Sequence, residues 1–264
     1  MIDRRTFLGT TAALGLASCA SSTFASSSLQ NGVTSEYGKL QRVIVHPPGP
    51  ETRKALPMLL GGHSMLTWEL LREEATSQHQ HMVDLLRKLG AEVLLFQELL
   101  DDAIQQARKQ NQWGDWLAAH APQLVDFERT LDAAALLGCN DDFVYTNDDA
   151  GYFRPLIDPL TTMFFTRDCA TMTPHGVIIC NYNNALRSFE ATLARFIFQY
   201  AAPLSGYEIV FDAKSENVFV QGGDILVVDE HTLMVGVGNS TSEQAASRLA
   251  EKLKMDVLAV QMPN

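Results

Sequence analysis

Two aspartates carry the most distinctive chemistry in this sequence. Asp168 follows an aromatic run and stands beside Thr166 and Arg167, and Asp224 follows a Gly-Gly pair at 222–223. Glycines allow a backbone to approach a ligand closely before a carboxylate is presented. A guanidinium group offers five N–H donors in a fixed fork, and a carboxylate accepts two of them in parallel. Each aspartate alone fits a structural turn or strand end, but the pair predicts a guanidinium site whose central carbon is open to attack.

The elements that must position these residues alternate between strand and helix, which predicts an α/β fold. Runs of β-branched and aromatic residues predict strands, and apolar residues at three- or four-residue steps predict helices. The predicted strands are 40–46, 93–96, 163–165, 176–180, the strands within 219–238, and 257–260. The predicted helices are 66–89, several within 98–137, 185–199 and one that begins near 241. We expect a helical insertion at about 98–150. We expect Asp168 to lie at the end of the strand that begins at 163.

The N-terminus has the features of an export signal. Arg4 and Arg5 form a twin-arginine signature, a short apolar run follows, and Leu-Ala-Ser-Cys at 16–19 resembles a lipoprotein box. The run is too short to span a membrane. We expect residues 1–30 to be a signal and a Ser-rich tether, and Cys19 to be lipidated, with a cleaved signal and an incidental Cys19 as the alternative. Either makes the protein an exported bacterial one, in the periplasm or anchored to a membrane by lipid alone.

Charge and motif content exclude several classes of function. The net charge of −11 argues against a nucleic-acid partner, because few cations are available to neutralise phosphates. No cysteine and histidine cluster has metal-ligand spacing, so we expect no metal site. Cys139, Cys169 and Cys180 are expected to be buried small hydrophobes. Cys169 directly follows Asp168, and on an extended strand its side chain would face the opposite way.

Several segments resemble the arginine deiminases of the guanidine-modifying, pentein-fold superfamily. Residues 35–51 resemble the opening strand and Pro-Gly turn of that family, and Phe-Thr-Arg-Asp at 165–168 resembles its segment of the same sequence. Gly-Gly-Asp at 222–224 resembles part of its Glu-Gly-Gly-Asp stretch. Arg187 and Glu190 are similar to its Arg and Glu after the next strand. The resemblance runs from about residue 35 to 264.

This resemblance implies a fold, a reaction and a set of roles. The fold would be a partial α/β propeller of about three of five ββαβ units, over residues 35–264. In the family a cysteine attacks the guanidinium carbon, a histidine acts as acid and base, and arginine becomes citrulline and ammonia without a cofactor. By resemblance Asp168 and Asp224 hold the guanidinium group, and Arg187 and Gln221 contact the small guanidino substrate.

The sequence also departs from the family pattern. Gln221 stands where the family has Glu, Ser240 where it has Arg, and Thr162 where it has Asn. No residue matches the family's catalytic histidine or cysteine, so we expect this chain alone to be inactive. We interpret it as a truncated or split hydrolase that is catalytic only with a missing C-terminal portion. Its expected macromolecular partner is either that portion or a second copy of the chain in a homo-oligomer. The alternative is a non-catalytic lipoprotein or pseudoenzyme that binds guanidino compounds.

Overall fold

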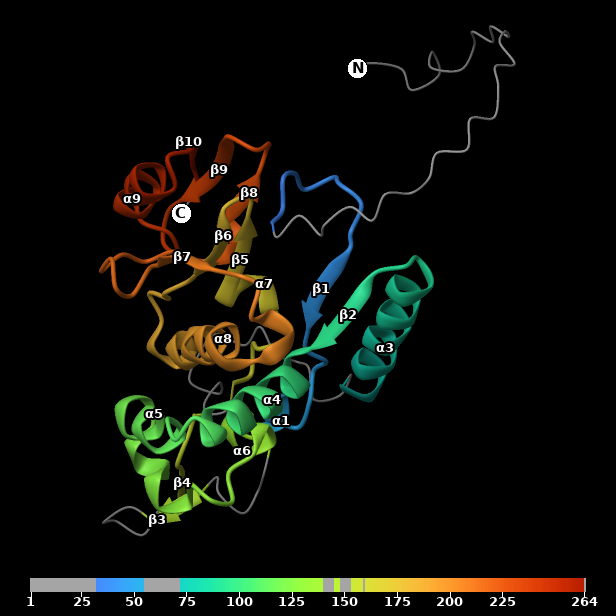
Figure 1. Ribbon diagram of the computed structural model, residues 1–264, viewed down its shortest axis with the longest axis vertical. Helices are drawn as coiled ribbons and strands as arrows, with labels where there is room; N and C mark the ends of the chain where they lie inside the picture. Colours follow the sequence, from blue (N-terminus) through green and yellow to red (C-terminus); the bar gives the residue numbers. More distant parts are fainter. Residues whose placement is uncertain (1–31, 55–71, 140–144, 148–152, 159, 264) are drawn as a thin grey trace, which may run out of the picture. The chain divides into compact units, whose positions relative to one another are not determined.

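The protein has an α/β fold (Figure 1). The computed structural model describes residues 32–54, 72–139, 145–147, 153–158 and 160–263. Its strands are β1 (Arg42–Val45), β2 (Glu92–Leu95), β3 (Tyr145–Asn147), β4 (Phe153–Pro155), β5 (Ala170–Thr173), β6 (Gly176–Ile179), β7 (Ile209–Asp212), β8 (Ile225–Val227), β9 (Thr232–Val237) and β10 (Asp256–Gln261). Its α-helices are α1 (Glu51–Lys54), α3 (Arg72–Lys88), α4 (Phe96–Lys109), α5 (Trp113–His120), α6 (Ala133–Leu137), α7 (Thr166–Cys169), α8 (Ser188–Tyr200) and α9 (Glu243–Leu253). Short 3-10 helices are η2 (Pro122–Phe127), η3 (Ala185–Arg187), η4 (Ala202–Leu204) and η5 (Gly222–Asp224).

The same ββαβ arrangement occurs twice. Strands β5 and β6 pair antiparallel, α8 follows, and β7 returns parallel to β6. Strands β8 and β9 pair antiparallel, α9 follows, and β10 returns parallel to β9. Near the N-terminus, β1 and β2 pair in parallel with α3 between them in the chain, which makes a βαβ unit. The turns that precede the two ββαβ units, α7 before β5 and η5 before β8, are in contact.

Two hydrophobic clusters hold these units together. One joins α4, α5, α6 and α8, and its largest buried side chains include Trp113, Phe96 and Phe196. Helices α4 and α8 pack directly against each other, as Figure 1 also shows. The second joins β6, β8 and β9 to α9, whose buried residues Ala245, Leu249 and Leu253 face the sheet. The helices that follow β2 lie in the stretch where the sequence predicts them.

The segment before Asp168 differs from the prediction. Residues 163–165 are not a strand, and Asp168 lies in the single helical turn α7. Successive turns close this segment, because the amides of Met163, Phe165 and Asp168 donate to carbonyls three residues earlier. Hydrophobic aromatics are common in strands, but here the Phe164 and Phe165 rings pack on each other, with centroids 4.2 Å apart. The expected strand end at Asp168 is therefore wrong, and so is the strand argument for Cys169.

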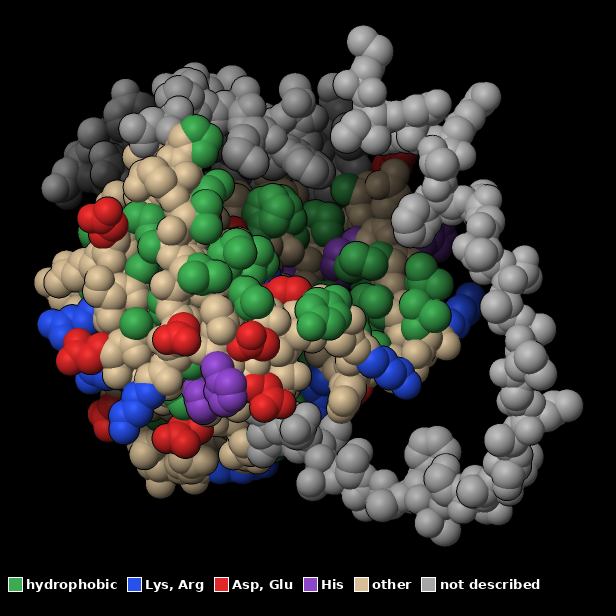
Figure 2. Space-filling model, turned by 90° about the horizontal axis from the view of Figure 1, so that it is seen from above, with side chains coloured by type: hydrophobic (Ala, Val, Ile, Leu, Met, Phe, Trp, Pro, Cys, Tyr) green, Lys and Arg blue, Asp and Glu red, His purple; other side chains and the backbone are tan. Residues whose placement is uncertain are grey.

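Most of the remaining strand and helix predictions agree with the structure within a few residues, although 66–71 of the predicted helix 66–89 lie outside the described residues. The short strand β3 lies inside the expected helical insertion at 98–150, which is therefore not helical throughout, and β5 and β7 were not predicted. One face of the β8–β9–β10 sheet is buried against α9, and large apolar side chains are exposed from Leu226, Leu258 and Val260. Figure 2 shows a face of the molecule on which hydrophobic and acidic side chains gather.

The expected signal and tether at 1–30, with Cys19, lie outside the described residues. Within the described ranges, no helix is long and apolar enough to cross a membrane.

Candidate functional site

Asp168 is held from two directions. Its Oδ2 atom accepts hydrogen bonds from Nη1 of Arg187 at 3.1 Å and from Nε2 of Gln221 at 2.9 Å. The carboxylate is only 14% exposed, and the Arg187 side chain is 15% exposed. A charge-assisted bond at this depth is stronger than a surface ion pair. Two donors on one oxygen leave Oδ1 of Asp168 as its available acceptor.

The Gly-Gly turn lies directly against Asp168. A Cβ on Gly223 would stand 2.7 Å from Oδ1 of Asp168, and a Cβ on Gly222 would stand 2.0 Å from the carbonyl oxygen of Arg167. Thr171 Oγ1 also donates to the Gly222 carbonyl, at 3.2 Å. Side chains at these two positions would push α7 and η5 apart. The glycines therefore allow a close backbone approach, as the sequence predicts.

Asp224 ends η5 and is oriented by the loop before α9. Its Oδ2 atom accepts a hydrogen bond from Oγ1 of Thr241 at 2.6 Å, and Thr241 is fully buried. The same hydroxyl accepts a hydrogen bond from the backbone amide of Gln221 at 3.1 Å. Thr241 thus fixes both ends of η5. The structure brings Asp168, Gln221 and the turn that carries Asp224 to one place.

Arg187 sits at the centre of a second cluster. Glu190, almost fully buried, accepts on Oε2 from Nε of Arg187 at 3.1 Å and from Nη2 at 2.9 Å. The guanidinium lies over the ring of Tyr182, with Cζ 4.3 Å from the centroid, and Nη2 contacts the Tyr182 hydroxyl at 3.3 Å. Burial alone would lower the pKa of Arg187, but Glu190, Tyr182 and Asp168 outweigh it and raise that pKa. Arg187 is permanently charged and rigidly held.

Arg167, the neighbour of Asp168, points away into a separate clamp. It binds Glu36 in a bidentate pair, with distances of 3.2 and 2.6 Å, and donates to the Ile225 carbonyl at 2.7 Å. Glu36 also accepts a hydrogen bond from the backbone amide of Val227 at 2.9 Å. This clamp joins α7 to β8. The resemblance covers Glu36, but no sequence signal assigns it this role.

The described cysteines are poorly suited to nucleophilic chemistry. Cys169 and Cys180 are buried, and burial raises the pKa of both thiols. Glu190 raises the pKa of Cys169 further, and Cys169 does the same to Cys180. Cys139 is only partly buried, and its thiol donates to the buried Glu51 at 3.0 Å, so the expectation of a buried small hydrophobe is wrong for this cysteine. The expectation that Cys169 is no catalytic thiol is thus supported by its burial.

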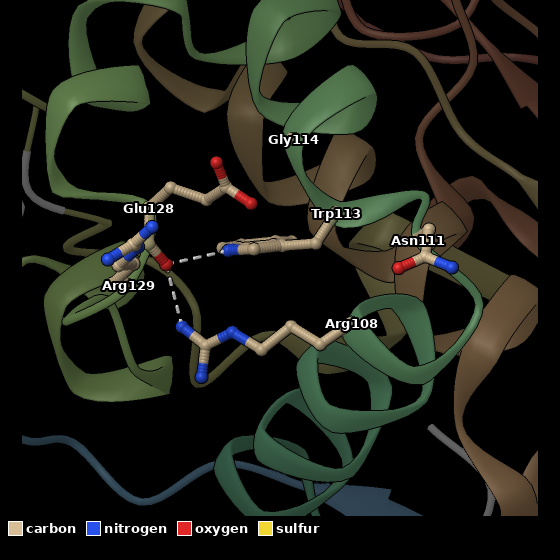
Figure 3. A pocket seen from close by; sticks show the side chains of 6 residues that line it. All are labelled: Arg108, Asn111, Trp113, Gly114, Glu128 and Arg129. Atoms are coloured by element: carbon tan, nitrogen blue, oxygen red, sulfur yellow. Dashed lines mark hydrogen bonds between the residues drawn. The ribbon is translucent and has the colours of Figure 1, made fainter.

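A cavity of about 430 Å³ lies elsewhere, between α4, α5 and η2. Its lining is drawn in Figure 3 and consists of Arg108, Asn111, Trp113, Gly114, Glu128 and Arg129. Both Arg108 and Trp113 donate to the Glu128 carbonyl, at 2.8 and 3.0 Å. None of the predicted site residues lines this cavity. The described residues contain no group of His, Cys, Asp and Glu side chains that could hold a metal.

Residues 139–264, which include α7, η3 and η5, match the family model of arginine deiminase. The C-terminal part of the chain is therefore similar to the arginine deiminase family.

Curated relatives extend the match over most of the chain. An arginine deiminase of Rhodococcus erythropolis is 28% identical over 260 residues, which cover 89% of this chain and 62% of the relative. A putative arginine deiminase of Mycoplasma pneumoniae is 29% identical and covers 85% and 59%. An arginine deiminase of Mycobacterium tuberculosis is 29% identical and covers 86% and 61%. The chain therefore spans about three fifths of the length of the curated relatives that it matches.

Two solved structures align with most of this chain at low identity. A DDAH of Pseudomonas aeruginosa in complex with citrulline has a TM-score of 0.49 at 12% identity, over 86% of this chain and 63% of that one. An amidinotransferase of Microseira wollei has a TM-score of 0.43 at 11% identity, over 88% and 62%.

Proposed function

We propose that this chain forms the guanidinium-binding part of an arginine deiminase-type hydrolase, with Asp168 and Asp224 as the carboxylates that hold the guanidinium group. The observation that carries this proposal is the contact between α7 and η5, in which Oδ1 of Asp168 faces Gly223, directly before Asp224. One oxygen of each aspartate is engaged by the protein, on Asp168 by Arg187 and Gln221 and on Asp224 by Thr241. The guanidinium would bridge the two remaining oxygens.

The charge of the site favours a cationic ligand. Asp168, Asp224 and the buried Glu190 contribute three carboxylates, and Arg187 contributes one guanidinium. The Arg167 and Glu36 pair adds no net charge. A bound guanidinium would reduce this excess of negative charge in a partly buried region, where charge interactions are stronger than in water.

The reaction we propose is hydrolysis of one guanidino C–N bond. A thiolate adds to the central carbon, ammonia leaves, and water then releases a ureido product and restores the thiol. We do not assign the thiolate to Cys169 or Cys180, because both are buried with raised pKa values. We assign the acid and base to none of the described residues. The described residues act by binding and orienting the group that reacts.

A non-catalytic binding protein is the second candidate, and Gln221 favours it. The amide of Gln221 donates to Asp168 at a position where the family has a carboxylate. An amide cannot accept a proton during turnover. Guanidinium binding would survive this replacement, while proton transfer at this position would not.

We also infer that the two ββαβ units and the βαβ unit are parts of a propeller, since each ββαβ unit repeats the pairing of the other. A propeller would place the start of each unit around a central axis. The site would then lie where α7 and η5 meet at that axis.

An assay of turnover and binding separates the two candidates. The purified chain is incubated with arginine, agmatine and methylated arginines, and ureido product and binding heat are both measured. Product would support the hydrolase, with a nucleophile outside the described residues. Binding without product would support the second candidate. The absence of both would rule out a guanidinium site at Asp168 and Asp224.

A further inference from the structure

Arg187 has little capacity left to bind a ligand. Its edge formed by Nε and Nη2 is occupied by Glu190, at 3.1 and 2.9 Å. At the other end, Nη1 donates to Asp168 and Nη2 contacts the Tyr182 hydroxyl. Among the described residues, a single N–H on Nη1 is left without an acceptor. A carboxylate is gripped well by two parallel N–H donors, and Arg187 has no such pair to offer.

The neighbouring donors are occupied as well. The Thr162 hydroxyl donates to Oε1 of Glu190. Arg167 is committed to Glu36 through two nitrogens and to the Ile225 carbonyl. Thr241, which is buried, donates its hydroxyl to Asp224. In the described part of the site, therefore, no fork of donors is ready for an anionic group.

Electrostatics point the same way. The cluster holds the carboxylates of Asp168, Glu190 and Asp224 against the single guanidinium of Arg187. A ligand carboxylate brought near it would be repelled by the excess negative charge. At an effective dielectric constant of about 20, two unit negative charges roughly 8 Å apart repel each other by about 2 kcal/mol. This energy corresponds to a loss of more than about tenfold in affinity.

We propose that this site selects guanidino compounds that carry no carboxylate, so that its preferred ligand is a decarboxylated or carboxylate-blocked relative of arginine with a neutral or cationic tail. The inference rests on the proposed function and adds the substrate class. The buried pair of Arg187 with Glu190 decides the selection, since it withdraws the one central guanidinium from solvent and ligand alike.

Three ligands that differ only at the carboxylate test this inference. Arginine carries the carboxylate, argininamide replaces it by an uncharged amide, and agmatine lacks it. Titration calorimetry with the full chain is expected to give argininamide and agmatine at least about tenfold tighter binding than arginine. Equal or tighter binding of arginine would overturn the selection and leave the proposed function standing. No binding of any of the three would overturn the proposed function and this inference with it.

Two variants address the cause of the selection. Glu190→Gln keeps the shape of the side chain but releases the Nε and Nη2 edge of Arg187, so the preference for agmatine over arginine should shrink by about tenfold. Ser240→Arg adds a guanidinium fork at an exposed position beside Thr241, and it should strengthen arginine binding while leaving or weakening agmatine binding. This second variant keeps the test decisive if Glu190→Gln folds poorly. Glu251→Gln, exposed on α9, is the matched control for removal of a carboxylate.

An unchanged preference in both Glu190→Gln and Ser240→Arg would contradict the role given to Arg187 and its donors. A change of the same size in Glu251→Gln would reduce the effect to overall charge, and it too would contradict the proposed role.

Discussion

At the scale of single residues, the site depends on which polar atoms are already engaged. Asp168 was predictable as a functional aspartate from its flanking residues and from Gly-Gly-Asp further along the chain. That its Oδ2 atom is shared by Arg187 and Gln221 could not be predicted, because these contacts join residues 19 and 53 positions away. Arg187 and Glu190 lie only three positions apart, but the sequence does not show that Glu190 is buried and occupies two nitrogens of Arg187. Residue type indicates what a side chain can bind, while only the folded chain shows what it already binds.

The first residue-scale prediction concerns the cysteines. Because Cys169 and Cys180 are buried with raised pKa values, we expect iodoacetamide at mildly alkaline pH to leave both unlabelled in the native protein. Both should react fully in denaturant, which is the internal control. Peptide mass spectrometry measures the labelling. Rapid alkylation of native Cys169 would reopen its candidacy as a nucleophile beside Asp168.

The second residue-scale prediction concerns the buried Glu51. Burial alone would raise its pKa, but hydrogen bonds with His46, Cys139 and the Gly49 amide outweigh this and lower the pKa below 4.5. A lowered pKa in the folded state adds stability that is fully present above the ordinary value and is lost as pH falls through the folded value. Urea unfolding across a pH series should therefore show a steeper acid loss for the wild type than for Glu51→Gln.

At neutral pH, Glu51→Gln should lower the free energy of unfolding by about 1–3 kcal/mol, because it disturbs buried hydrogen bonds. The exposed replacement Glu251→Gln serves as the control and should change little. If wild type and Glu51→Gln lost stability in parallel below neutral pH, the stabilising role of the ionised carboxylate would be wrong.

At the scale of elements, hydrophobic periodicity and runs of β-branched residues were sufficient to predict most of the strands and helices. Strands β1, β2, β6 and β10 and helices α8 and α9 lie where the patterns predict them. Helices α8 and α9 each bury an apolar face and β6 is buried throughout, whereas β10 is mostly exposed. The pattern failed at 163–165, where an aromatic run is folded into turns. Short runs of this kind are ambiguous, because hydrophobicity alone does not distinguish a strand from a buried turn. The failure occurs at the site itself, where the backbone is irregular.

The element-scale prediction is that η5 requires Gly222. A Cβ there would meet the Arg167 carbonyl at 2.0 Å and Thr171 Oγ1 at 2.4 Å, so Gly222→Ala should force α7 and η5 apart. We expect a loss of about 1–3 kcal/mol in unfolding free energy from overpacking, together with loss of guanidinium binding. Thermal unfolding and titration calorimetry measure the two effects.

Gly38→Ala is the matched control for Gly222→Ala, because its Cβ would meet only the movable Ser35 hydroxyl at 3.2 Å. Thr241→Val removes the donor to Asp224 with little change of volume, and it should weaken binding even if Gly222→Ala does not fold. Full binding in Thr241→Val would show that Asp224 needs no orienting donor.

At the scale of the whole molecule, the chain is similar to arginine deiminases and spans about three fifths of the length of the curated relatives that it matches. The α/β class followed from the order of the predicted elements. The pairing of β6 with β7 and of β9 with β10 did not, because parallel partners are joined through a helix and no local signal specifies them. The contact between α7 and η5, which creates the proposed binding site, likewise joins residues far apart in the sequence.

The central claim is that Asp168 and Asp224 hold a guanidinium group. Titration of the chain with methylguanidinium, which has no tail to bind elsewhere, tests this most directly by calorimetry. We expect saturable binding to the wild type that weakens at least about tenfold in Asp168→Asn and in Asp224→Asn, since each keeps its shape but loses its charge. Glu251→Gln should bind as the wild type does. Equal affinity in all four proteins would contradict the account.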